Sequence, residues 1–416
     1  MSTLQRAVSE IREAEVETTY AWLRLLASVC LSTIGGVGMW SVVVAMPALQ
    51  AEFGVARSAV SLPYTLTMVC FGIGGVVMGR LADRFGAMPP VILATILLGI
   101  GYALAGTAPT LLQFSLVQGV LLGFGSSATF APLLADTSRW FTRRRGIAVG
   151  ICASGNYLAG AIWPPVVQHF IQTAGWRHTY IGIGMFCVVT MLALALALKR
   201  RAPSAADGSD TTPAASWSDR PLGMSPRALH VLLSIAGVAC CVAMSMPQVH
   251  LVAYCADLGY GPARGAEMLS VMLGFGIVSR LASGWICDHI GGLRTLLLGS
   301  TLQGIALLLF VPFDGLVSLY LIAALFGLFQ GGIVPSYAII IRDYFPPQEA
   351  GWRVGVVLMA TLFGMALGGW MSGVIFDLTG SYRAAFVNGI AWNALNVSIA
   401  FWLLKRSRDQ VQLARA

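Results

Sequence analysis

An arginine lies deep inside an apolar stretch of this sequence. Residues 278–292 read VSRLASGWICDHIGG, and Arg280 falls within the apolar run 266–287. About eight residues, or ~12 Å of helix, separate it from Asp288 near the end of that run, which is too far for easy snorkelling to the surface. Inserting an arginine at such depth costs about 2.5 to 3.5 kcal/mol, so the side chain is expected to face a cavity or a partner.

The partner of Arg280 is predicted from the shape of its guanidinium. This planar group holds a carboxylate through two parallel hydrogen bonds, a geometry that lysine lacks. The alternative is a salt bridge to a buried acid, but the inner two-thirds of the apolar runs lack Asp and Glu, and Asp136 and Asp257 fall at their ends. The sequence therefore favours an organic anion with at least one carboxylate.

Other polar residues recur at helical spacing. Pro247, His250, Tyr254 and Asp257 follow one another at steps of three or four, which places them on one helix face. His250 is either a donor to the substrate and a proton carrier or a histidine that packs between helices.

Further candidates lie in other apolar runs. Asn156 and Tyr157 either contact the substrate or form hydrogen bonds between helices. Aromatic residues either wall the apolar part of a substrate or only pack and anchor the helices. The predicted substrate-binding residues are Arg280, His250, Tyr254, Asn156, Tyr157, Trp40, Tyr337 and Trp370.

The elements that position these residues follow from composition. The 416 residues are 57% hydrophobic and 11% charged, whereas soluble domains are about 25% charged. Apolar runs of about 20 residues without alternation predict membrane-spanning helices and exclude a barrel. Twelve spans are expected, at 21–48, 57–79, 88–106, 109–135, 146–170, 179–198, 228–256, 264–287, 293–312, 316–341, 350–376 and 384–404.

The basic residues predict the orientation of these spans. With the N-terminus inside, 20 of the 26 Lys and Arg residues fall on inner segments and four on outer loops, namely Arg57, Arg177, Arg264 and Arg383. Both termini are therefore expected in the cytoplasm of a multi-pass inner (plasma) membrane protein. The net charge of +8 reflects this rule, and no basic domain is present that would receive a nucleic acid.

The chain divides around a polar, Ser- and Pro-rich stretch that is too polar to bury. The predicted parts are a cytoplasmic N-terminal segment 1–20, a six-helix bundle 21–199, a cytoplasmic linker 200–227, a second six-helix bundle 228–404 and a cytoplasmic tail 405–416. The bundles are related, because GRLADRFG at 79–86 aligns with GWICDHIG at 284–291 at an offset of 205 residues. Gly175 and Gly380 are separated by the same offset. The predicted fold is all-α, with two pseudo-symmetric halves.

These features together resemble the major facilitator superfamily. The loop motif at 79–86, its degenerate copy at 284–291, the twelve spans and the central linker carry the resemblance. The stretches VHLVAYCADLGY (249–260), SRLASG (279–284) and RWFTRRRG (139–146) are similar to bacterial members of the monocarboxylate porter and oxalate/formate exchanger groups. The resemblance implies a substrate bound at mid-depth while the two halves rock around it, and it assigns carboxylate binding to Arg280.

The loop motif implies a gate at the inner surface. Gly79 and Gly284 are expected to let helices approach closely, while Asp83, Arg84 and Asp288 form ion pairs or helix-end contacts that hold the gate shut. The alternative is that these charges only mark a cytoplasmic turn.

The sequence also departs from the resembled family. Trp40 aligns with a lysine of animal-type members, and Gly276 replaces an acid one turn before the arginine. Exchangers for oxalate carry a second cation in the eleventh helix, whereas no charge falls between Arg353 and Asp377 here. Because one deep cation can neutralise one carboxylate, the sequence predicts a monocarboxylate as the substrate.

The predicted function is therefore secondary transport of a small monocarboxylate or related organic anion by a monomer, with anion exchange and proton symport both open. The rival interpretations are a drug or sugar carrier and a sensor that binds a solute without moving it. An enzyme is not expected, because the five histidines and eight cysteines show no metal-ligand spacing and no nucleophile–base pair is evident. No metal or cofactor is predicted.

Overall fold

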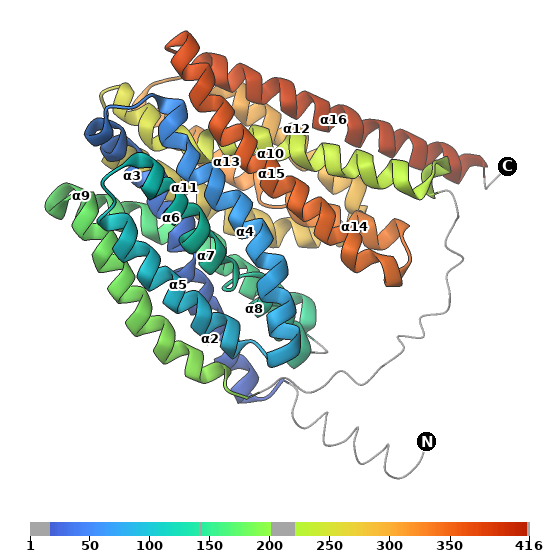
Figure 1. Cartoon of the computed structure of the whole chain (residues 1–416). Helices are drawn as coiled ribbons and strands as arrows, with labels where there is room; N and C mark the ends of the chain where they lie inside the picture. Colours follow the sequence, from blue (N-terminus) through green and yellow to red (C-terminus); the bar gives the residue numbers. More distant parts are fainter. Residues whose placement is uncertain (1–16, 142–143, 201–220, 414–416) are drawn as a thin grey trace.

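The computed structural model describes residues 17–141, 144–200 and 221–413, and every regular element in these ranges is a helix (Figure 1). The first half contains α2 (Thr19–Gly35), α3 (Val37–Phe53), α4 (Arg57–Phe85), α5 (Met88–Gly106), α6 (Leu111–Val117), η1 (Gln118–Gly123), α7 (Phe124–Ser127), α8 (Ala131–Trp140), α9 (Arg145–Ala195) and η2 (Leu196–Leu198). The second half contains η3 (Pro221–Gly223), α10 (Pro226–Asp257), α11 (Pro262–Ile290), α12 (Gly292–Leu309), α13 (Leu316–Gln330), α14 (Ile333–Tyr344), α15 (Pro347–Thr379) and α16 (Tyr382–Leu413).

The predicted all-α membrane fold with twelve crossings is confirmed. Eleven helical stretches in the described ranges are long and apolar enough to span a membrane, and one of them, Gly146–Leu198, has 53 residues. This stretch is long enough for two crossings, since a bilayer core needs about 20 residues. It is interrupted at Gly175, whose φ of 79° and ψ of 157° are not helical, at the predicted join between the fifth and sixth spans.

The internal repeat is visible in the backbone. Three pairs of glycines with positive φ lie 205 residues apart: Gly54 (61°) and Gly259 (81°), Gly86 (91°) and Gly291 (83°), and Gly175 (79°) and Gly380 (65°). Glycine adopts positive φ without the clash that a Cβ would cause. Each half therefore turns between helices at equivalent positions, as two copies of one plan require.

Two ends of the bundle are distinguished by the connections they carry. At the linker end, η2 finishes at Leu198 and η3 begins at Pro221, while α3, α10 and α15 end at the opposite side, here called the far end. Most of the predicted N-terminal segment 1–20 and of the predicted linker 200–227 lies outside the described residues. Within the described part of the linker, η3 spans Pro221–Gly223 and α10 already begins at Pro226. The predicted tail 405–416 begins as a continuation of α16, which is helical to Leu413.

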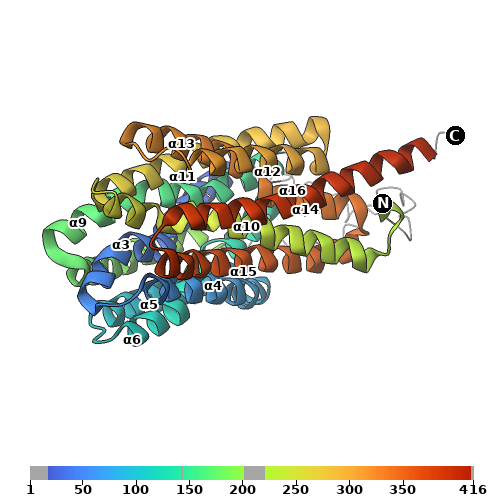
Figure 2. The same cartoon turned by 90° about the horizontal axis from the view of Figure 1, so that it is seen from above.

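The two halves meet along two pairs of long helices. In both views α4 lies beside α15, and α9 of the first half packs against α11 of the second (Figures 1 and 2). These pairs, together with α3 and α10, enclose the middle of the molecule.

Candidate functional site

A cavity of about 350 Å³ lies between the two halves. Its walls are residues of α3, α4 and α9 from the first half and of α10, α11 and α15 from the second, with shorter contributions from α8 and α14. Most of the lining side chains are apolar, as is usual for small-molecule sites.

Arg280 lines this cavity from α11. Its Nη1 donates a hydrogen bond to the Ala153 carbonyl oxygen over 3.2 Å, and its guanidinium carbon lies 4.8 Å from the centroid of the Tyr157 ring. Its Nε is buried and has no hydrogen-bond partner. None of the ion pairs formed by residues in the described ranges includes Arg280.

The departure at Gly276 has a structural reason. A Cβ at this position would lie 2.4 Å from Tyr157 Cε1, so α11 leaves room there for an aromatic ring from α9. That ring then covers one face of the Arg280 guanidinium, a cation–π contact that stabilises a partly desolvated charge.

Two more predicted residues share the cavity. Asn156 lies next to Tyr157 on α9, and Trp40 reaches the lining from α3. Gly160 allows this approach, because a Cβ there would lie 2.9 Å from the Trp40 ring and 2.3 Å from Leu273. The buried Trp40 Nε1 has no hydrogen-bond partner among the described residues. The structure thus brings together Arg280, Tyr157, Asn156 and Trp40.

His250 and Tyr254 do not line the cavity. His250 is fully buried inside the second half, with Nε2 2.7 Å from the Gly369 carbonyl oxygen and Nδ1 3.4 Å from the Tyr382 hydroxyl. Tyr254 packs edge-on against Tyr382 and Phe386. On the polar face predicted for this span, His250 and Tyr254 therefore turn toward α15 and α16, whereas Asp257 pairs with Arg57 of α4.

Tyr337 and Trp370 also lie outside the cavity. The Tyr337 hydroxyl donates to Asn396 Oδ1 over 2.9 Å in the interior of the second half. Trp370 is 38% exposed on the outside of the bundle, where aromatic side chains contact lipid.

Three polar residues of the lining, Tyr64, Gln248 and Thr361, are not predicted from the sequence. Gln248 donates from Nε2 to Gln330 Oε1 over 2.9 Å, and the Thr361 hydroxyl donates to the Leu358 carbonyl over 2.7 Å. The signal in the sequence for Gln248 is an uncharged amide within an apolar run, two residues before His250.

The halves are closed at the far end by charged groups. Arg57 Nη2 lies 3.1 and 3.0 Å from the two carboxylate oxygens of Asp257 on α10. Asp377 on α15 accepts hydrogen bonds of 2.8 Å each from the backbone N–H groups of Arg57 and Ser58. Arg57, which the sequence assigns to an outer loop, is only 5% exposed. These contacts join the second half to the first turn of α4.

The linker end is open. On α15, Gly373 lies toward the far end, whereas Gly351 and Gly355 lie toward the linker end. A Cβ at Gly373 would lie 2.8 Å from Ser61 of α4, while a Cβ at Gly355 or Gly351 would meet no described atom within 4 Å. The same holds at Gly79 and Gly284. The close helix approach expected at these two glycines is therefore not present in this conformation, because the halves spread apart where they lie.

The predicted gate charges do not join the two halves in this conformation. Asp83 pairs with Arg139 of its own half over 2.7 Å, with both side chains exposed. Arg84 lies over the neighbouring Phe85 ring. Asp288 is exposed and takes part in none of the ion pairs of the described ranges. A conformation closed at the linker end is needed to bring these groups together.

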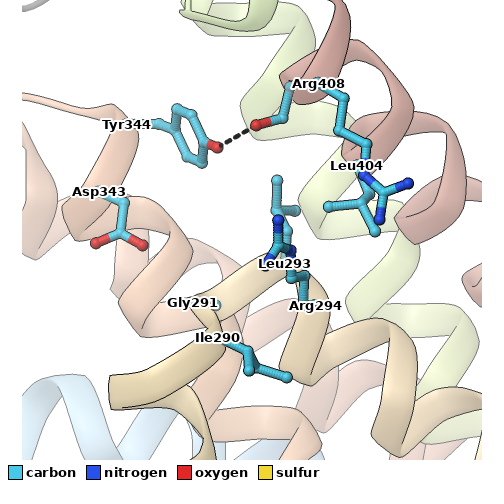
Figure 3. Close-up of a pocket in the computed structure, with 10 residues that line it drawn as sticks. Ile290, Gly291, Leu293, Arg294, Asp343, Tyr344, Leu404 and Arg408 are labelled. Carbon is cyan, nitrogen blue, oxygen red and sulfur yellow. Dashed lines mark hydrogen bonds between the residues drawn. The ribbon is translucent and has the colours of Figure 1, made fainter. Parts of the chain in front are cut away.

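A second cavity, of about 570 Å³, lies at the linker end of the second half. Figure 3 shows Arg294, Asp343 and Arg408 around it, with Tyr344 hydrogen-bonded to Ser407 over 3.3 Å. All its walls come from α11, α12, α14 and α16 or the turns between them. It does not lie between the halves, so rocking of one half against the other does not expose it alternately to the two ends.

Two similar six-helix halves, a central cavity open at one end and a polar closure at the other are the architecture of a membrane transporter. The family model of the Major Facilitator Superfamily matches residues 29–322 and 268–415. The chain belongs to this superfamily, whose members are transporters and not enzymes. The expected resemblance to this superfamily is confirmed.

The curated relatives include monocarboxylate transporters. The chain is 30% identical over 347 residues to monocarboxylate transporter 13 of Bos taurus, covering 81% of this chain and 78% of the relative. It is 27% identical over 383 residues to monocarboxylate transporter 11 of Mus musculus, covering 88% and 84%. The chain is thus a transporter related to monocarboxylate transporters.

Solved structures share the fold. A bacterial homolog of the human lysosomal transporter Spinster, in an inward-facing and occupied conformation, has a TM-score of 0.72 at 15% identity, covering 94% of this chain and 98% of that one. The nucleoside transporter NupG also has a TM-score of 0.72 at 15% identity, with coverage of 92% and 99%.

Proposed function

We propose that this protein carries a small organic anion with one carboxylate across the plasma membrane by alternating access, and that Arg280 binds the carboxylate. The observation that carries the proposal is the unpaired guanidinium of Arg280 in the cavity between the halves. The relatives named above are monocarboxylate transporters, which agrees with this proposal.

The geometry of Arg280 leaves one edge of the fork for a ligand. Nη1 is engaged by the Ala153 carbonyl and the ring of Tyr157 covers one face. Nε is unpartnered but buried, and Nη2 makes no hydrogen bond with the described residues. A carboxylate would therefore bind first at Nη2, and it would accept a second, parallel hydrogen bond from Nε once the side chains that cover Nε move.

The charge of the lining favours a monoanion. Arg280 is the one Lys, Arg, Asp, Glu or His side chain among the described lining residues of this cavity. One carboxylate neutralises it, whereas a dianion would leave a negative charge in a largely apolar cavity, which is costly. Asn156, Tyr157 and Trp40 complete the proposed site.

Anion exchange is the proposed coupling mode. Closing the empty cavity would leave Arg280 desolvated and unpaired, whereas a bound anion compensates it. Loaded transitions are therefore easier than empty ones. A proton route through His250 is less well supported, because both ring nitrogens contact groups of the second half, away from the cavity.

The proposed orientation places the linker end in the cytoplasm, following the distribution of basic residues. With that orientation, the far-end closure is the outer one and the conformation is inward-facing. The gate proposed for Asp83, Arg84 and Asp288 then closes the cytoplasmic side in the opposite conformation, and a monomer is sufficient for the cycle.

The test is counterflow of radiolabelled monocarboxylates in proteoliposomes, with Arg280→Lys and Arg280→Ala. Hydrogen bonds to charged groups contribute about 1.5 to 3 kcal/mol. Arg280→Lys keeps the positive charge but loses the two parallel N–H donors of the guanidinium, so it is expected to weaken binding about 10- to 150-fold. Ala is expected to abolish uptake. Arg383→Lys is the matched control, because Arg383 is an exposed arginine that pairs with Asp314. Unchanged counterflow in Arg280→Ala would contradict the proposal.

A further inference from the structure

Resting on this proposed function, we infer that the preferred substrate is a bulky monocarboxylate, whose aromatic or branched aliphatic body is held by a methionine-rich wall shared between the halves. The proposal comes from the lining of the cavity, its volume and the engagement of its polar groups.

The wall contains five of the 16 methionines of the chain. Met39 and Met68 belong to the first half, and Met244, Met359 and Met365 belong to the second. The thioether side chain is flexible and polarisable, so it adapts to apolar bodies of different shape and makes favourable contacts with aromatic rings. Such a surface suits a body larger than a methyl group.

These methionines lie where the halves meet. The Met359 sulfur on α15 is 2.6 Å from the position that a Cβ on Gly72 of α4 would occupy, so this side chain already packs across the boundary. A substrate body seated beside it contacts both halves at once. Binding of a bulky acid is thus linked directly to the relative position of the two halves.

The volume of the cavity exceeds the need of a short acid. About 350 Å³ lies between the halves, in a space lined mostly by apolar side chains. An acid of the size of lactate would leave part of this space as water against methionine and leucine side chains. A larger apolar body displaces that water and removes apolar surface from it.

The polar groups of the lining are few. The Gln248 amide donates to Gln330, and the Thr361 hydroxyl donates to a backbone carbonyl. Arg280 Nε and Trp40 Nε1 are buried without a partner, and the hydroxyls of Tyr64 and Tyr157 and the Asn156 amide make no hydrogen bond with the described residues. This pattern fits one anionic group, a few further polar atoms such as a hydroxyl, and an otherwise apolar body.

The experiment compares lactate with 3-phenyllactate, which has the same carboxylate and hydroxyl and differs by a phenyl ring. Binding to the purified full-length protein is measured by calorimetry and transport by counterflow. Butyrate and indole-3-acetate form a second pair. The bulky acid of each pair is expected to bind at least about tenfold more tightly, since even one methylene in an apolar pocket contributes about tenfold or more.

Substitutions on the wall test where the ring binds. Met365→Ala is expected to weaken 3-phenyllactate at least about threefold and to leave lactate unchanged, while Met365→Leu, which keeps the volume, retains the preference. Met185→Ala is the matched control, because Met185 is 63% exposed on the outside of the bundle. The unfolding midpoint of each variant without ligand establishes that it is folded.

Each outcome decides between the two proposals. If small and bulky acids bind equally well and both lose binding in Arg280→Ala, the proposed function stands and the bulky-substrate inference is overturned. If the bulky acids bind better but Met365→Ala and Met185→Ala behave alike, the assignment to the methionine wall is overturned. If no acid of the panel binds, or all bind to Arg280→Ala as to the parent, both proposals fall.

Discussion

The far-end closure makes the sharpest prediction about the transport cycle. Helix α4 begins after Ala56, whose side chain makes no capping hydrogen bond. Asp377 of the other half accepts from the first two N–H groups instead, at 2.8 Å each. Asp377→Ala removes an N-terminal cap of α4 that exists only while the far end is closed.

The size of the effect follows from the two bonds and the charge. Losing an N-cap side chain to Ala costs about 1 kcal/mol, and losing a carboxylate at the positive end of a helix costs about 0.5 kcal/mol more. Because the open far end lacks these contacts, about 1.5 kcal/mol is lost from the closed state alone. The ratio of far-end-open to far-end-closed molecules should therefore rise about tenfold.

The assay is the labelling rate of a cysteine placed at Ser61, which is fully buried and lies beside Gly373 at the boundary of the halves. A membrane-impermeant maleimide added from the far-end side should modify Cys at this position about tenfold faster in Asp377→Ala. Asp314→Ala is the matched control, because its exposed bridge to Arg383 lies within the second half. Equal rates in the Asp377→Ala variant and the parent would refute the reasoning.

Two further predictions concern groups that the structure places outside the cavity. Arg24 and Asp136 form an ion pair of 2.7 Å with side chains only 2% and 7% exposed, so Arg24→Ala should cost about 3 to 5 kcal/mol of stability by leaving a buried carboxylate unpaired. The unfolding midpoint measures this loss of stability. Replacing both Arg24 and Asp136 by apolar residues should recover much of the lost stability. An unchanged midpoint in Arg24→Ala would contradict the expectation. His250→Gln should keep counterflow within about twofold of the parent, because the ring contacts Gly369 and Tyr382 away from the cavity. A large loss of counterflow with unchanged stability would indicate that His250 contributes to substrate binding.

The sequence by itself determined the class of protein, the spans and the repeat. Lipid offers the backbone no hydrogen-bond partner, so long apolar runs must be helices whatever their neighbours are. Glycines with positive φ mark equivalent turns because this conformation is a local property of the residue. The depth of Arg280 follows equally locally, from 1.5 Å of rise per residue.

Only the tertiary structure decided which helix faces meet. In a membrane, both lipid-facing and core-facing side chains are apolar, so the pattern along one helix does not fix its rotation against the next. His250 therefore faces α15 while Gln248 of the same helix lines the cavity. Asp377 caps a helix that begins about 320 residues earlier in the chain because the two halves close on each other, a contact that no local rule of spacing or propensity contains.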